Sequence, residues 1–268
     1  ENTGDGAGIL LQTPHLFFEK KAREMGFQLP EFGKYGVGTV FFPMDRMLRN
    51  QCRVLFTDYI DELGFELLDF RKIPTDSEDL GDSAVAVEPR MEHVFVKPKT
   101  EMDPKQLERR LFVLRKFATH NIHNTFPQSK DNFYITSFSY KTVVYKGQLT
   151  TGQVRPYFPD LQDELFESAI ALVHSRFSTN TVPKWKLAQP FRYIAHNGEI
   201  NTINGNLNWW KAKEHLFKTD LFSSDELEKL KPIIGDGHSD SGSFDNVMEF
   251  LTQSGRDPLH TSMMLVPE

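Results

Sequence analysis

The sequence contains a single cysteine and has no long apolar run. Cys52 is the only cysteine among 268 residues, so an internal disulfide is excluded and a reducing compartment suits the chain. No apolar stretch approaches the roughly 20 residues that span a bilayer, so we expect no membrane association. The net charge of −6 argues against a nucleic-acid partner, because phosphate neutralisation requires clustered basic side chains. Apolar, aromatic and charged fractions of 39%, 12% and 25% are those of an ordinary soluble globular protein.

Both ends of the sequence lack the usual marks of a chain terminus. The chain opens with "ENTGDGAGILLQTP", without an initiator methionine, signal peptide or transit peptide. It stops at "MMLVPE", directly after an apolar run that is typical of a strand. We therefore expect an interior piece of a longer polypeptide. Because the length suits one large domain and no linker or repeat divides it, residues 1–268 are predicted to form a single domain.

Hydrophobic periodicity predicts strands mixed with helices. Helical spacing occurs over 14–26, 45–63, 103–121, 206–217, 223–231 and 245–255. Strand patterns occur over 9–11, 35–43, 65–74, 92–98, 166–178 and 191–198, and 132–150 reads as two strands joined in a hairpin near Ser139. The segment 74–90 is predicted to be a connecting loop. Since strands and helices do not alternate strictly, an α+β layered sandwich is favoured over a doubly wound parallel sheet.

Three polar motifs directly follow apolar runs: "HSRFSTN" at 174–180, "HNGE" at 196–199 and "GHSDS" at 237–241. If they converge, they suit a free amino acid. Arg176 could bind an α-carboxylate through its guanidinium fork, and Asp240 could hold an α-ammonium group. Asn197 and the N–H of Gly198 could form an oxyanion hole for a carbonyl under attack.

Each motif also has an ordinary structural interpretation. An arginine at a strand end commonly makes a surface ion pair, "SDS" commonly caps a helix, and Asn-Gly is a strong turn signal. The histidines His174, His196 and His238 with Asp240 would suit a metallohydrolase, but their spacing matches no metal signature, so we expect no metal. The HxxH spacing within 119–124 is predicted to lie in a solvated loop.

The block "RFSTNTVPKWKLAQPFRYIAHNGEINTINGNLNWW" over 176–210 resembles the glutaminase domain of glutamate synthase large subunits. "TGDGAGIL", "FYITSFSYKTVVYKGQL" and "SDSGSFDNVMEFL" are similar to the same family in the same order, so the resemblance covers the chain. Trp210 stands where the family has methionine. The larger class is the N-terminal-nucleophile (Ntn), class II glutamine amidotransferases. Their fold, a four-layer α/β/β/α sandwich with mostly antiparallel sheets, is therefore expected here.

The resemblance assigns roles to individual positions. Arg176 would bind the α-carboxylate of glutamine, and Asp240 would bind its α-ammonium group. Asn197 and Gly198 would form the oxyanion hole. The other expected pocket residues are Thr179, His196 and Glu199, with Asn201 and Thr202 shaping the loop behind them.

The resemblance also implies a nucleophile that this sequence does not show. The family uses a cysteine at the mature N-terminus, whose own α-amino group acts as general base. The sequence does not begin with cysteine, and Cys52 lies within a predicted amphipathic helix, where a thiol behaves as a small hydrophobe. We therefore expect this chain alone to be inactive.

In the parent enzyme, the resemblance implies hydrolysis of L-glutamine to glutamate and ammonia. The ammonia would pass to a synthase domain of the same polypeptide, an oxidoreductase that aminates and reduces 2-oxoglutarate. FMN, an iron–sulfur cluster and NAD(P)H or ferredoxin would serve that reaction, with a small NAD(P)H-oxidising subunit as a further partner. The expected location is the cytoplasm, or a plastid. The alternative is a non-catalytic binding or assembly domain that keeps the amidotransferase fold.

Overall fold

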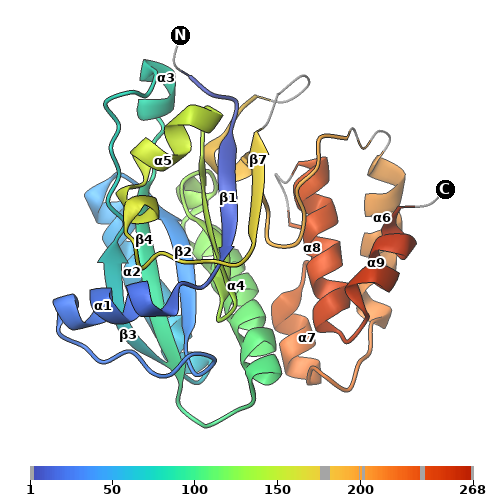
Figure 1. Cartoon of the computed structure of the whole chain (residues 1–268). Coiled ribbons are helices and arrows are strands. Elements are labelled where there is room, and N and C mark those ends of the chain that lie inside the picture. Colours follow the sequence, from blue (N-terminus) through green and yellow to red (C-terminus); the bar gives the residue numbers. More distant parts are fainter. Residues whose placement is uncertain (1–2, 176–181, 199, 201–202, 236–238, 267–268) are drawn as a thin grey trace.

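Two antiparallel sheets form the centre of the molecule (Figure 1). The computed structural model describes residues 3–175, 182–198, 200, 203–235 and 239–266. One sheet has the strand order β3–β4–β2–β5 and the other has the order β6–β1–β7. The strands are β1 (Ala7–Gln12), β2 (Gly36–Phe42), β3 (Phe65–Lys72), β4 (Arg90–Pro98), β5 (Tyr134–Ser139), β6 (Thr142–Gly147) and β7 (Ala171–Ser175).

Helices surround the sheets, and their starts follow the capping signals in the sequence. They are α1 (His15–Met25), α2 (Arg46–Glu62), α3 (Asp82–Val85), α4 (Pro104–Thr125), α5 (Val154–Tyr157), α6 (Ile203–Lys213), α7 (Ser224–Leu230), α8 (Asp240–Gln253) and α9 (Pro258–Leu265). Asp45 caps α2 by accepting the N–H of Leu48, and Asp103 caps α4 in the same way. The predicted loop over 74–90 contains the short helix α3.

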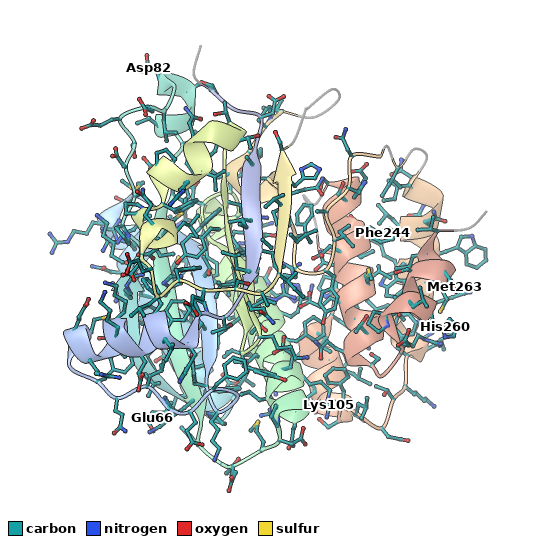
Figure 2. The ribbon with its side chains drawn as sticks, in the orientation of Figure 1. Glu66, Asp82, Lys105, Phe244, His260 and Met263 are labelled. Atoms are coloured by element: carbon teal, nitrogen blue, oxygen red, sulfur yellow. The ribbon has the colours of Figure 1, made fainter. Side chains whose placement is uncertain are left out.

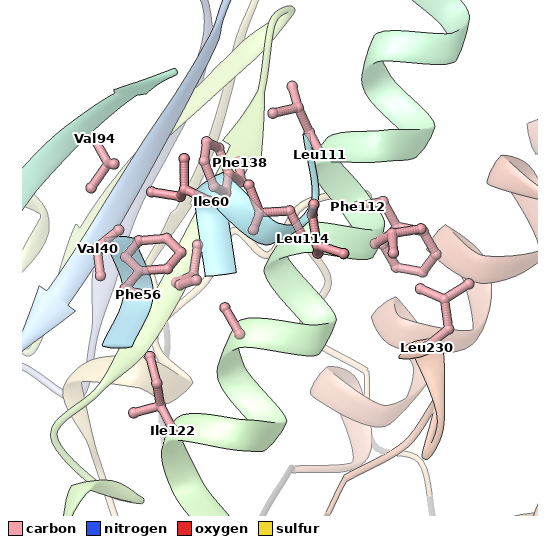
Figure 3. Close-up of a cluster of buried hydrophobic side chains, with 14 of the residues drawn as sticks. Val40, Phe56, Ile60, Val94, Leu111, Phe112, Leu114, Ile122, Phe138 and Leu230 are labelled. Carbon is pink, nitrogen blue, oxygen red and sulfur yellow. The ribbon is translucent and has the colours of Figure 1, made fainter. Parts of the chain in front are cut away.

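Helices α2 and α4 cover one face of the four-stranded sheet. Figure 3 shows Phe56 and Ile60 of α2 and Leu111 of α4 packed beside Val40 and Val94 of the sheet. These side chains are fully buried, so their apolar surface stabilises this layer by the hydrophobic effect. All seven residues of β2 are buried, because the second sheet covers the opposite face.

The layer between the two sheets contains both aromatic side chains and a buried polar network. The Arg71 guanidinium binds Asp160 through two 2.6 Å hydrogen bonds, and the Tyr145 hydroxyl donates to the same carboxylate at 3.0 Å. His93 lies 3.2 Å from both Arg71 and Tyr145 and has no exposed surface. Burial, together with the positive charge of Arg71, lowers the pKa of His93 well below its usual value.

The arrangement confirms an α+β fold with antiparallel sheets. The layers run from α2 and α4 through the four-stranded sheet to the three-stranded sheet, and α6 to α9 gather beside β7 and α4 (Figure 1). Figure 2 shows His260 and Met263 on the side of α9 that faces away from the sheets. Within the described ranges, no helix has the length and apolarity of a membrane span.

Two strand predictions in the middle of the chain are wrong. The two strands within 132–150 do not form a hairpin ladder, because β5 pairs with β2 and β6 pairs with β1, in different sheets. Ser139 stabilises the turn between them, since its hydroxyl oxygen accepts hydrogen bonds from the N–H groups of Lys141 and Thr142. The segment 191–198 is irregular rather than a strand, because its backbone N–H groups at Tyr193 and His196 donate to the side chains of Asp245 and Gln189 in place of a ladder.

Two further predictions fail near helices. The final apolar run is part of α9, because Pro258 starts a helix and Asp257 caps it by accepting the N–H groups of Leu259 and His260. The HxxH pair lies in α4, which extends to Thr125, and not in a loop. The ring of His123 packs at the helix surface with Nε2 3.0 Å from the carbonyl oxygen of Phe133.

Candidate functional site

The backbone of His196 is held by the side chain of Gln189. The Oε1 atom of Gln189 accepts the His196 N–H at 2.9 Å, and its Nε2 atom donates to the His196 carbonyl oxygen at 3.0 Å. Gln189 is 6% exposed, so water competes little for these two bonds. These two contacts fix the backbone directly before Asn197 and Gly198, which are the residues predicted to form an oxyanion hole.

The segment before Gln189 is anchored on strands β1 and β6. Gly8 of β1 lies under the Gln189 carbonyl, and a Cβ atom at Gly8 would be 2.8 Å from that oxygen. The same Cβ would be 2.5 Å from the Cβ of Lys146 on the neighbouring strand. Lys146 is fully buried, and its Nζ donates to the carbonyl oxygens of Ala188 at 2.7 Å and Lys186 at 3.0 Å. A glycine in β1 and a buried amine in β6 therefore position the segment.

The segment after Gln189 is anchored on helix α8. Arg192 makes ion pairs of 2.9 Å with both Asp245 and Glu249, and Asp245 also accepts the N–H of Tyr193 at 2.8 Å. Glu249 is shared with Arg115 of α4, which ties α8 to the helix layer. Burial alone would lower the pKa of Arg192, but the two carboxylates outweigh that cost and raise the pKa.

The tip of the loop carries the predicted oxyanion donors. Asn197 and Gly198 are exposed to solvent. The N–H of Gly198 donates to Nδ1 of His196 at 3.2 Å, so the ring accepts at Nδ1 and carries its hydrogen on Nε2. Within the described ranges, that buried Nε2 has no hydrogen-bond partner. In this conformation the Gly198 N–H therefore points at the imidazole ring and not at a ligand.

Asp240 meets this loop from the first turn of α8. Its Oδ2 atom accepts the N–H of Ile200 at 3.3 Å, and its Oδ1 atom accepts the N–H of Ser241 at 2.6 Å. The preceding Ser239 caps the helix by accepting the N–H of Gly242, so the capping interpretation of "SDS" is correct for Ser239. Two of the three polar motifs thus converge, with the carboxylate of Asp240 one residue beyond the cap.

The structure leaves other predicted site residues untested. Arg176, Thr179, Glu199, Asn201 and Thr202 lie outside the described residues, as does His238 of the metallohydrolase alternative. Strand β7 ends at Ser175, directly before Arg176, and His174 pairs with Gly8 across the sheet. Among the residues that the structure describes, no three His, Cys, Asp or Glu side chains gather as a metal site would require.

Cys52 is not part of this site. It is fully buried in α2, within the core between the helices and the four-stranded sheet. Burial raises the pKa of its thiol to about 11, so it is protonated near neutral pH and lacks the nucleophilic thiolate form. The predicted role of Cys52 as a small buried hydrophobe is confirmed.

The fold and the converging loop and helix define a class of protein. Over residues 1–268 the chain matches the family described as "Glutamine amidotransferases class-II", and it belongs to that family. It is 44% identical over its full length to the glutamate synthase [NADPH] large chain of Bacillus subtilis and 42% identical to the glutamate synthase [NADH] of Saccharomyces cerevisiae. It is 37% identical to the ferredoxin-dependent glutamate synthase of Pyropia yezoensis. The chain spans only 17%, 13% and 17% of these relatives, respectively.

Proposed function

We propose that the chain is the glutaminase part of a glutamate synthase and binds L-glutamine at the loop over 196–200. The contact between Asp240 and the N–H of Ile200 carries the proposal, because it brings the expected ammonium ligand to the expected oxyanion loop. The similarity to glutamate synthases over the whole chain supports the choice of substrate.

In the proposed reaction, a cysteine sulfur attacks the side-chain amide carbon of glutamine. The carbonyl oxygen becomes an oxyanion that accepts hydrogen bonds from the Asn197 side chain and the Gly198 N–H. The general base takes the thiol proton during the attack and gives it to the departing nitrogen as the C–N bond breaks, so ammonia leaves and a thioester remains; water then cleaves the thioester, which releases glutamate and restores the thiol. Arg176 and Asp240 would hold the two charged groups of the substrate. The Gly198 N–H has to turn away from His196 Nδ1, its partner in the structure, to serve the oxyanion.

We propose that Cys52 is not the nucleophile and that the chain as printed does not turn over glutamine. Its burial and raised thiol pKa support this, and a side chain inside α2 offers no α-amino group as general base. The reaction would then depend on an N-terminal cysteine of the parent protein.

The remaining proposals concern the parent protein. Ammonia would pass to a synthase domain that aminates 2-oxoglutarate, and a small NAD(P)H-oxidising subunit would be a further partner. FMN, an iron–sulfur cluster and NAD(P)H or ferredoxin would bind in that other part. A cluster needs several cysteine thiolates, and this chain has one cysteine. The setting would be the cytoplasm or a plastid.

A non-catalytic binding or assembly domain is the second candidate. The hydrogen bond between Gly198 and His196 favours it, because it occupies a donor that catalysis would need. The two candidates are separated by treating the full-length protein with a thiol-reactive glutamine analogue and measuring intact mass and glutaminase activity. One adduct with loss of activity supports the enzyme. A protein with neither labelling nor glutaminase activity supports the second candidate.

A further inference from the structure

A cavity of about 350 Å³ lies between α4, the start of β5, the segment over 186–192 and α8. None of the described residues of the proposed glutamine site, His196, Asn197, Gly198 and Asp240, lines it. Its volume is at the small end of the range for ligand pockets, about 300–1,000 Å³, and exceeds what one water molecule fills. The cavity is therefore suited to a small ligand.

The walls of this cavity carry mostly positive charge. The lining cations are Arg115, Lys116, Lys130, Lys186 and Arg192, and the only lining carboxylate among the described residues is Asp131. Asp131 is already shared, because both Lys184 and Lys186 make ion pairs with it, at 3.0 and 2.9 Å. Such walls repel a cationic ligand and give a neutral ligand no electrostatic stabilisation, whereas they attract an anion.

Among the described residues, the buried cations behind the wall are only partly paired with carboxylates. Asp245 and Glu249 compensate Arg192 and Arg115, which lie at the base of the cavity. Lys116 is 4% exposed, and its recorded hydrogen bond is to the carbonyl oxygen of Ile233 at 2.7 Å, a neutral acceptor. Among the described residues, no carboxylate forms an ion pair with Lys116, and burying an ammonium group without an ion-pair partner costs several kcal/mol. In the part of the chain that the structure describes, Lys116 is therefore the lining cation at the base without an ion-pair partner.

Donor groups remain unused beside that lysine. An ammonium group has three N–H bonds, and the Lys116–Ile233 contact uses one of them. The neighbouring Arg115 is 5% exposed, and within the described ranges its Nε has no hydrogen-bond partner. Burial and the nearby charges of Arg115 and Arg192 lower the pKa of Lys116, an effect that a bound anion would oppose. The carboxylate of Glu214, which accepts the N–H of Ile233, acts on Lys116 in the same direction as an anion would.

We propose that this cavity binds a small oxyanion, a phosphate or a carboxylate group, held by Lys116 and Arg115 at its base with Lys186 at its rim. The oxyanion accepts N–H groups of Lys116 and Arg115 and places a negative charge beside them. Because α4, α8 and the segment over 186–192 all contribute walls, a bound anion stabilises the junction between the helix layer and α8.

The test compares anion binding by the full-length protein and two single variants. Calorimetric titration and thermal unfolding are measured with inorganic phosphate and with acetate, against chloride at equal ionic strength. Lys116→Met keeps most of the length of the side chain and removes the charge. Lys105→Met is the matched control, because Lys105 lies exposed in the first turn of α4, about three turns before Lys116 (Figure 2). Anion sites elsewhere in the full-length protein contribute equally to both variants, so only the difference between them is interpreted.

We expect phosphate or acetate to bind wild type and Lys105→Met with the same affinity, and Lys116→Met to bind at least about 10-fold more weakly. A preference for phosphate or for acetate identifies the source of the oxyanion. Equal binding by Lys116→Met and Lys105→Met, or no response beyond chloride, overturns the proposal. If Lys116→Met does not fold, Lys186→Met at the rim must weaken binding instead, and an unchanged affinity of that variant equally overturns it.

Discussion

Gln189 forms a closed pair of hydrogen bonds, 2.9 and 3.0 Å long, with the N–H and the carbonyl oxygen of His196. The two residues are joined by an irregular segment that Gly8 and Lys146 fix on one side and Asp245 fixes on the other. The position of the proposed oxyanion loop is therefore set by the three-stranded sheet and by α8 together. This makes Gln189 a positioning residue for the proposed glutaminase reaction.

Replacing Gln189 should lower the rate of glutamine hydrolysis strongly, while the free energy of unfolding falls only modestly. Gln189→Met removes both bonds to His196, each worth about 0.5–1.5 kcal/mol of stability. Gln189→Glu keeps the acceptor for the His196 N–H but places a carboxylate oxygen against the carbonyl. Because small displacements of a catalytic loop cost up to about 100-fold in rate, we expect kcat with glutamine to fall about 10- to 100-fold in the full-length enzyme.

The control for this series is Gln162→Met, at an exposed glutamine whose side chain donates to the carbonyl oxygen of Arg155. It should leave glutamine-dependent and ammonia-dependent glutamate synthesis unchanged. Ammonia-dependent glutamate synthesis should survive in the Gln189 variants, since their defect lies in glutamine cleavage. Equal loss of the two activities would show that Gln189 serves general folding and not the loop.

Gly8→Ala should destabilise the chain by about 1–3 kcal/mol, the usual cost of forced overpacking. The added Cβ would meet the backbone oxygens of Tyr145 and Gln189 at 2.7 and 2.8 Å, and neither can move without shifting a strand or the segment before His196. Gly152→Ala is the matched control, because nothing lies within 4 Å of a Cβ there. Urea denaturation of both variants measures the difference, and equal stabilities would contradict the close packing described for β1.

Much of the helix layer could be predicted from local signals. Asp45 and Asp103 are N-cap residues that mark the starts of α2 and α4, and apolar residues at helical spacing follow each of them. Sheet membership is not local: the turn at Ser139 separates β5 from β6 because each strand has a long-range partner. For α9, the Asp257-Pro258 pair is a helix-start signal, but the apolar run after it has the pattern of a strand, so the prediction from that run is wrong.

The candidate site was predictable only in its chemistry. Residue types show only that Asp240 and the loop over 196–199 would suit an amino acid if they converged, and the family resemblance assigns them to one site; the structure places Asp240 beside Ile200. The support from Gln189 and Lys146 could not be predicted, because it depends on Gly8 allowing another segment to lie directly on β1. A glutamine before a proline carries no sequence signal for such a contact.

Asp240→Asn in the full-length enzyme should abolish glutamine-dependent glutamate synthesis and spare ammonia-dependent synthesis. The change keeps the shape of the side chain but removes the negative charge proposed to hold the α-ammonium group. Asp225→Asn is the control, since Asp225 lies equally in the first turn of a helix, α7, and pairs with Lys229. A mutant that keeps its glutamine KM and kcat would rule out the proposed role of Asp240.

The stability of the chain should fall on acidification through His93. The folded state holds His93 neutral among Arg71, Asp160 and Tyr145, and its pKa lies well below the unfolded value of about 6.5. The unfolded state therefore binds more protons below that pH, so the stabilisation is fully present above pH 6.5 and is lost as the pH falls. Well below pH 6.5, the free energy of unfolding should drop by about 1.4 kcal/mol per pH unit on account of this residue.

Comparing the pH dependence of stability in wild type and His93→Gln isolates the proton that His93 takes up on unfolding. Urea denaturation between pH 8 and pH 5 should give a shallower acid slope for the variant, by about one proton, while the two curves run parallel above pH 7.5. Other titrating groups, including His123, whose pKa burial also lowers, are present in both proteins and cancel in the difference. Identical slopes in the acid range would mean that His93 accepts a proton in the folded state. In that case the Asp160 carboxylate, which already binds Arg71 and Tyr145, would have to balance a second buried positive charge.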